Sequence, residues 1–127
     1  MKKTFRLRRF LRDESGATAM EYGLVMPLLI MGILGAMWAG MLMFSASSLD
    51  LAVQAAARCM AVDANQCGSA SATETYAQSQ YSGPAISPAF TASASGCGHT
   101  VTGQATFDLG ILPGVANVPL SSSACYP

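Results

Sequence analysis

The feature that most limits how this chain can fold is an uncharged apolar run, Gly23–Phe44, near its N-terminus. A run of this length predicts an α-helix that crosses a lipid bilayer, because roughly 20 apolar residues span the hydrocarbon core. Glu21 stands at the start of the run, where a carboxylate is costly in lipid and therefore indicates a function. The alternative is an interfacial glutamate that only marks where the membrane begins.

Charges are distributed unevenly around this run, although the formal net charge of the chain is zero. The leader Met1–Gly16 is basic, whereas Arg58 is the only basic residue after Tyr22. Positive charge beside a spanning helix stays in the cytoplasm, so we expect a cytoplasmic N-terminus and an exported C-terminal part. We expect no nucleic-acid partner, since Arg58 is the only basic residue outside the leader.

Three kinds of export segment combine a basic leader with an apolar run. A signal peptide has a shorter apolar core of about 7–15 residues, although Ser45-Ala46-Ser47 could serve as its cleavage site. A lipoprotein needs a cysteine directly after the run, and the first cysteine is Cys59. We favour the third kind, a leader removed at Gly16, because it also accounts for Glu21 and for the length of the run.

The residues around this point also resemble a known family. Arg9–Tyr22 reads Arg-Phe-Leu-Arg-Asp-Glu-Ser-Gly-Ala-Thr-Ala-Met-Glu-Tyr, which is similar to the processing site of type IVb prepilins, the Flp and TadE group. The resemblance implies that a prepilin peptidase cuts after Gly16. Ala17 would then be the new N-terminus, and Glu21-Tyr22 would be the pair that the family uses in assembly. Ala56-Ala57-Arg58 also resembles a helical stretch of TadE-like proteins.

The resemblance implies a structural role, as a minor pilin or pseudopilin of a Tad/Flp tight-adherence pilus system. The implied partners are the prepilin peptidase, the major Flp-type pilin, other TadE-like and TadF-like pseudopilins, and the pilus assembly platform of the inner membrane. The implied location is the inner membrane, crossed once, with the C-terminal part periplasmic or extracellular, or in the pilus. Whether the subunit lies in the filament, at its tip or at its base stays open. The alternative is a single-pass anchored module that binds surfaces or sugars through a Thr/Ser-rich sheet.

Small residues recur at helical spacing within the apolar run. Gly32, Ala36 and Gly40 fall at i, i+4 and i+8, so they share one stripe of the helix. Such stripes let neighbouring helices approach closely in lipid, and we expect this one to serve helix packing. The alternative is that glycine and alanine are simply common in membrane helices.

The helix is expected to continue past the membrane. Ala46–Ala64 contains no glycine or proline and carries an apolar stripe at helical spacing. The stripe consists of Leu49, Val53, Ala56 and Met60. A polar stripe, Asp50, Gln54 and Arg58, runs beside it. Ser71-Ala72-Thr73-Glu74 matches a capping box and predicts a short second helix to about Gln80.

The remaining sequence predicts strands. Apolar and polar residues alternate over Phe90–Ala94 and Thr100–Leu109, as in half-buried strands. Leu112-Pro113-Gly114 predicts a turn. A last strand is expected from Val118, at an edge of the sheet because Pro119 cannot donate a ladder hydrogen bond.

These elements predict an α+β fold stapled by disulfides. It has a long N-terminal transmembrane helix that continues on the exported side, a short second helix, and a small antiparallel sheet of about three strands packed on the helix. The expected domains are a cleaved leader at 1–16, a membrane and assembly helix at 17–44, the extended and second helices at 45–81, and a linker and β domain at 82–127.

Four cysteines all fall on the exported side, namely Cys59, Cys67, Cys97 and Cys125. An even number in an oxidising compartment predicts two disulfides, for which three pairings exist. We expect Cys59–Cys67, which spans a helix end and the following turn. We also expect Cys97–Cys125, because both residues have the parity of the outer face of the sheet.

No motif in the sequence indicates catalysis. The chain has no His-Glu-x-x-His, no Gly-x-Ser-x-Gly and no phosphate-binding glycine loop, so we expect neither an enzyme nor a cofactor. Cys97-Gly98-His99 could supply two metal ligands. With a single histidine in the chain, we expect no metal site there.

Overall fold

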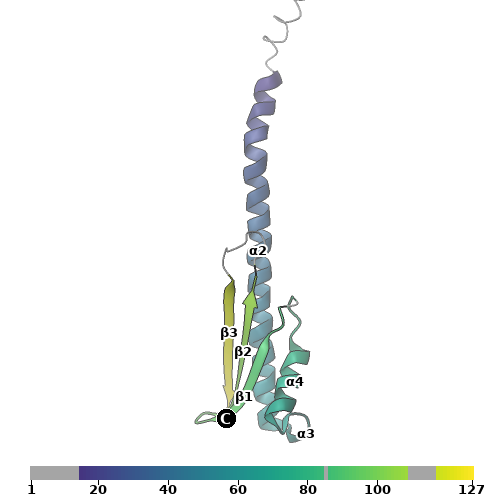
Figure 1. The fold of residues 1–127 in the computed structure, drawn as a ribbon, viewed down its shortest axis with the longest axis vertical. Coiled ribbons are helices and arrows are strands. Elements are labelled where there is room, and N and C mark those ends of the chain that lie inside the picture. The colour runs from purple at the N-terminus through teal and green to yellow at the C-terminus, as the bar shows by residue number, and fades with distance from the viewer. Residues whose placement is uncertain (1–14, 85, 109–116) are drawn as a thin grey trace, which may run out of the picture. The chain divides into compact units, whose positions relative to one another are not determined.

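A computed structural model describes residues 15–84, 86–108 and 117–127 (Figure 1). Its elements are α2 (Ser15–Val62), α3 (Ala64–Cys67), α4 (Ala70–Gln80), β1 (Ala89–Ser95), β2 (Gly98–Phe107) and β3 (Val118–Tyr126). The α+β fold expected from the sequence is confirmed. Most of the leader and the turn expected at Leu112-Pro113-Gly114 lie outside the described residues.

The chain divides into two units, residues 1–37 and 38–127, and α2 contributes to both. α2 is a single helix of 48 residues that continues through Pro27 and ends at Val62. Asp63 stops it by capping the next helix, because its carboxylate accepts the backbone N–H groups of Asn65 and Gln66 at 3.0 and 3.2 Å. The expected helix Ala46–Ala64 therefore ends two residues early, and α3 forms in the segment expected to be a turn.

The sheet belongs to the second unit and has the antiparallel order β1-β2-β3. Phe90 lies opposite Gly103, and Val101 opposite Ala124. Phe107 and Val118 pair where β2 and β3 are joined through residues 108–117. β3 is an edge strand and carries Pro119, as expected.

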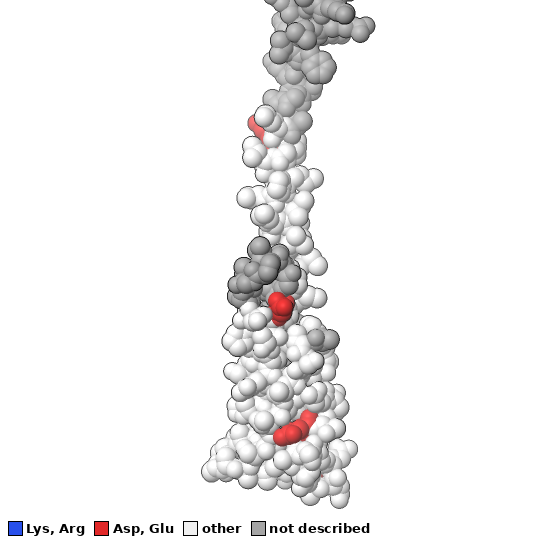
Figure 2. Space-filling model, viewed as in Figure 1, with Lys and Arg blue, Asp and Glu red and all other residues white. Residues whose placement is uncertain are grey.

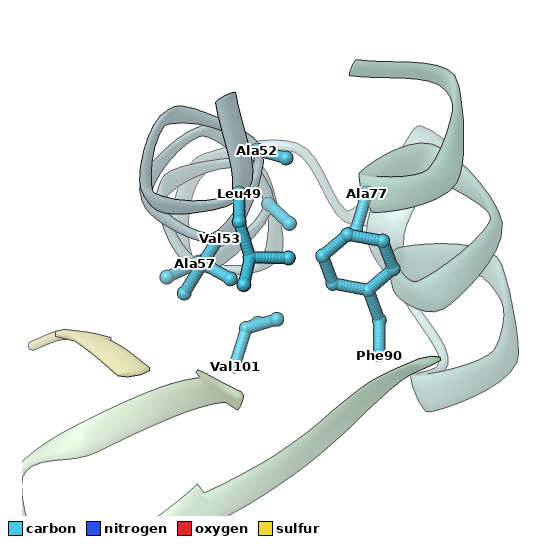
Figure 3. Packing of buried hydrophobic residues seen from close by; sticks show 8 residues of the cluster. Leu49, Ala52, Val53, Ala57, Ala77, Phe90 and Val101 are labelled. Atoms are coloured by element: carbon cyan, nitrogen blue, oxygen red, sulfur yellow. The ribbon is translucent and has the colours of Figure 1, made fainter. Parts of the chain in front are cut away.

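The core of the second unit lies between α2, the sheet and α4. In Figure 3, side chains from α2, α4, β1 and β2 point toward one another. Those from α2 include Leu49 and Val53, which are at most 1% exposed and belong to the predicted apolar stripe. Ala56 of that stripe is also buried, whereas Met60 is half-buried at its end. The predicted polar stripe lies on the exposed side of α2.

Gly103 on β2 lets the helix approach the sheet closely. A Cβ there would lie 2.8 Å from Val53 Cγ2, 2.9 Å from Phe90 Cε1 and 3.0 Å from Leu49 Cδ1. These distances are shorter than van der Waals contact, so any side chain at position 103 must displace the core.

The start of the second helix differs from the prediction. α4 begins at Ala70, with Ser69 as its N-cap, and the Ser69 hydroxyl accepts the Ala72 N–H at 3.2 Å. The capping box expected at Ser71–Glu74 is therefore wrong, because the Glu74 carboxylate is used elsewhere. It accepts the Ala92 N–H of β1 at 3.2 Å, which satisfies a backbone donor of the sheet.

Both expected disulfides are confirmed. Cys59 at the end of α2 is bonded to Cys67 of α3, with Cα atoms 5.8 Å apart. Cys97, in the turn between β1 and β2, is bonded to Cys125 of β3, with Cα atoms 6.4 Å apart. Gly98 follows this turn with φ +126°, and a Cβ there would collide with the Tyr126 carbonyl oxygen.

Candidate functional site

The residues expected to act in processing and assembly lie in the first turns of α2. Gly16 and Ala17 are helical, and the structure describes only their backbone. Glu21 lies four residues after Ala17, which is about one turn and 6 Å along the axis. Glu21 and Tyr22 are exposed, the tyrosine at 72%. The structure therefore places Glu21 one turn from the residue that processing would make the N-terminus.

The helix that follows carries a continuous apolar surface. Met20–Met37 is exposed at every position in the single chain. The large exposed side chains of this segment include Leu24, Leu28, Met31 and Met37, each more than 60% exposed. α2 is long and apolar enough to cross a membrane, and no residue of its most apolar window is buried. Such a surface is stable in lipid or against other apolar helices.

The expected packing stripe is open. Ala36 is exposed, and a Cβ added to Gly32 or Gly40 would meet nothing within 4 Å. Among the described residues, no neighbour therefore requires a glycine at either position, in contrast to Gly103. Their absent side chains leave room for the close approach of another helix.

Sequence reasoning missed the point at which the sheet first meets α2. Trp38 is half-buried, and its ring packs edge-on against Phe107 of β2, with ring centroids 6.1 Å apart at 77°. Trp38 lies inside the apolar run, so its hydrophobic character alone could not indicate a partner in the sheet. The C-terminal end of the run is therefore covered on one face by the folded domain.

Two serines of α2 beyond this contact are also buried. The Ser45 hydroxyl is inaccessible and donates to the Met41 carbonyl at 2.8 Å. Ser48 is 4% exposed and accepts the Ser82 N–H at 3.0 Å, which ties α2 to the segment after α4. A signal-peptidase site at Ser45-Ala46-Ser47 fits this structure poorly, since all three residues lie within α2 and Ser45 is buried.

Tyr81, the C-cap residue of α4, lies next to the buried Ser45 of α2. Its hydroxyl donates to the Pro84 carbonyl at 3.1 Å. Burial raises the pKa of Tyr81 above its ordinary value, and a hydrogen bond with Ser45 partly opposes that rise. The tyrosine therefore acts as a neutral structural group.

Charged side chains are sparse on the described surface. Figure 2 shows one face on which almost all described side chains are uncharged, with acidic groups at separate points. Asp50 is held on the exposed side of α2, where its carboxylate accepts the Gln54 amide and the Ser122 hydroxyl, each at 2.7 Å. In residues 15–84, 86–108 and 117–127, no three His, Cys, Asp or Glu side chains lie close enough to hold a metal ion.

Comparison with known proteins agrees with the N-terminal resemblance. Residues 16–58 match the model of the family described as TadE-like protein. The match begins at the expected cleavage site and ends at Arg58, so it covers most of α2 and none of the sheet. No curated protein and no solved structure matches the chain.

Proposed function

We propose that this chain, whose residues 16–58 match the TadE-like protein family, is a minor pilin or pseudopilin of a Tad/Flp pilus system. The carrying observation is a long apolar helix that is exposed at every position over Met20–Met37, in the part of the chain that the structure describes, and that holds Glu21 near its start. A helix of this kind is suited to two environments in turn, the inner membrane and the core of a helical assembly.

In this proposal the prepilin peptidase removes the leader after Gly16 at the cytoplasmic face. The new α-amino group on Ala17 is largely protonated at neutral pH. Glu21 is then an anion one turn away, at the entrance to an apolar helix. A charge removed from water without a partner costs several kcal/mol, so both groups require partners when subunits pack together.

The resemblance to type IV pilins supplies those partners. The Glu21 carboxylate of one subunit pairs with the Ala17 amine of its neighbour, which neutralises both charges only when the helices are in register. The stripe of Gly32, Ala36 and Gly40 allows the same helices to approach closely, since no side chain of this subunit lies within 4 Å of a Cβ at either glycine. Charge pairing thus selects the register, and apolar packing supplies most of the stabilisation.

Processing is tested with Gly16→Trp in the full chain, co-produced with a prepilin peptidase. We expect the bulky residue to leave the leader attached, which N-terminal sequencing and intact mass detect. Gly23→Trp is the matched control, because a Cβ at Gly23 meets nothing within 4 Å. Wild-type protein that begins at Met1 or near Ser47 would contradict the proposal and support the anchored adhesion module.

Assembly is tested with Glu21→Gln in cells that produce the complete pilus system. The variant should be inserted and cleaved normally but should not co-purify with the major pilin. Glu14→Gln makes the same chemical change in the leader, which processing removes, and should assemble like the wild type. Wild-type recovery of Glu21→Gln with the major pilin would reduce Glu21 to a marker of the membrane boundary.

A further inference from the structure

We propose that α2 leaves the hydrocarbon at Trp38, and that Trp38, held by its contact with the buried Phe107 ring, seats the domain on the interfacial layer of a phospholipid bilayer. The inference rests on the membrane anchoring within the proposed function. It shortens the membrane segment expected from the sequence, which ran to Phe44. It also places the end of the sheet beside Phe107, where Thr106 and Asp108 are exposed, at the level of the lipid headgroups.

The first reason is the position of the sheet along the helix. The Trp38 and Phe107 rings are in contact, so the end of β2 lies level with Trp38. β3 is an edge strand, and it starts with Val118 paired to Phe107. An open sheet edge is not tolerated in hydrocarbon, because its backbone N–H and C=O groups have no water to bind. If hydrocarbon reached Phe44, about 9 Å further along the axis, it would surround this part of the sheet.

The second reason is the charge next to the contact. Asp108 follows Phe107 directly and is exposed. A carboxylate is tolerated among headgroups but is costly within the hydrocarbon. An exposed carboxylate at this position therefore favours a bilayer core that ends before Asp108, at the level of the aromatic pair.

The third reason is length. Met20–Met37, the segment of α2 that is exposed at every position, rises about 27 Å as an α-helix. This matches the roughly 30 Å core of a bilayer without residues 38–44. Tryptophan is enriched at membrane interfaces because its ring is apolar and its indole N–H binds polar groups. Trp38 thus stands where an aromatic anchor is expected.

The fourth reason is the exposed side of α2 just beyond Trp38. Met41, Met43 and Phe44 are more than 50% exposed, although the other face of the helix is covered. No charged residue occurs on α2 between Glu21 and Asp50. The exposed side of α2 therefore stays apolar for about one turn or more beyond the aromatic pair, and charged residues that require water come only later. This is the pattern of a segment that passes through the headgroup layer.

The chain offers a direct test, because Trp38 is its only tryptophan. The full chain is reconstituted into phosphatidylcholine vesicles that contain lipids brominated either near the glycerol or near the end of the acyl chain. We expect shallow bromines to quench Trp38 fluorescence at least two-fold more than deep bromines. Acrylamide in the aqueous phase should quench it only weakly.

Two single-tryptophan variants calibrate the depth in a Trp38→Phe background, which keeps an aromatic ring against Phe107. Leu29→Trp should be quenched most by deep bromines, and Leu51→Trp, at an exposed aqueous position, mainly by acrylamide. Stronger quenching of Trp38 by deep bromines would overturn the inference while leaving membrane anchoring intact. Protection of Trp38 from both lipid and acrylamide would also overturn it, since protein would then cover the contact. Failure of Leu29→Trp to respond to any brominated lipid would instead contradict the anchoring on which the inference rests.

Discussion

The two halves of α2 share one backbone conformation but differ in what covers them. Residues 20–37 are exposed at every position, whereas residues 38–62 bury one face against the sheet and α4. Glycine shows the contrast most directly, because Gly32 and Gly40 have open space around them, whereas Gly103 on β2 is surrounded by Leu49, Val53 and Phe90. The first half is stabilised by an environment outside the chain, and the second by the chain itself.

This difference predicts where substitutions will affect folding and where they will affect only association. A change on the covered face should lower the free energy of unfolding of the domain. A change on the open half should leave that free energy unaltered and act in the membrane or the filament. Trp38 fluorescence reports unfolding of the domain in detergent, because its ring packs against Phe107.

The largest effect is expected for Leu49→Ala. Leu49 is 1% exposed in the core, and its truncation leaves a cavity that should cost about 2–5 kcal/mol of unfolding free energy. Leu51→Ala is the matched control, since Leu51 is 65% exposed and its truncation should change stability by less than about 0.5 kcal/mol. Denaturant unfolding followed by Trp38 fluorescence measures both. Equal effects of the two substitutions would show that the covered face has been misassigned.

The next largest effect is expected for loss of the disulfide between Cys97 and Cys125. In the loop-entropy model a ring with a sequence separation of 28 contributes about 3.5 kcal/mol, against about 2.5 kcal/mol for the separation of 8 between Cys59 and Cys67. We therefore expect a larger loss of stability in the double variant Cys97→Ser/Cys125→Ser than in Cys59→Ser/Cys67→Ser. The thermal midpoints measure the ranking, and a reversed order would mean that strain or local packing outweighs ring size.

A smaller effect is expected for Gly103→Ala. The new methyl group would enter the space between three core side chains and should cost about 1–3 kcal/mol by overpacking. Gly40→Ala adds the same methyl group where nothing lies within 4 Å, and it should leave domain stability unchanged. If the two variants unfold at the same denaturant concentration, the helix does not approach the sheet as closely as described.

The smallest effect is expected for Tyr81→Phe, which removes the hydrogen bond to Pro84 and should cost about 1 kcal/mol at neutral pH. Burial raises the pKa of Tyr81 in the folded state above the ordinary value near 10. Its contribution is therefore complete below about pH 10 and is lost as the pH rises further. Unfolding curves between pH 8 and 11 should show a shallower alkaline decline for Tyr81→Phe than for wild type. Tyr22→Phe, at an exposed position, is the control at neutral pH.

Local patterns predicted much of the fold, because the side chains concerned act through neighbouring residues. Alternation in β2 predicted that Val101, Ala105 and Phe107 face the core, and all three are buried. The same parity argument predicted the disulfide between Cys97 and Cys125, because side chains on one face of adjacent strands lie within reach of each other.

Long-range contacts are what the local patterns could not predict. Ser48 looks like a poor core residue until Ser82, which lies 34 positions away, donates its N–H to it. Glu74 fits a capping box, but its contact with Ala92 of β1 overrides that local role. Among the site residues, the exposure of Glu21, Gly32 and Gly40 agrees with an assembly surface, and their roles remain predictions because their partners are other molecules.

The two disulfides also determine how the domain would respond to mechanical load. A pull between α2 and the end of β3 passes through Cys59–Cys67 and Cys97–Cys125 rather than through the loops they close. The two segments closed by these disulfides, with sequence separations of 8 and 28 residues, therefore cannot extend. Without the disulfides they would add roughly 25 and 90 Å to the length of the stretched chain. Even a domain whose noncovalent core had yielded would lengthen mainly between Cys67 and Cys97. A subunit under tension would thus lengthen through one defined segment, while the two segments closed by disulfides keep their length.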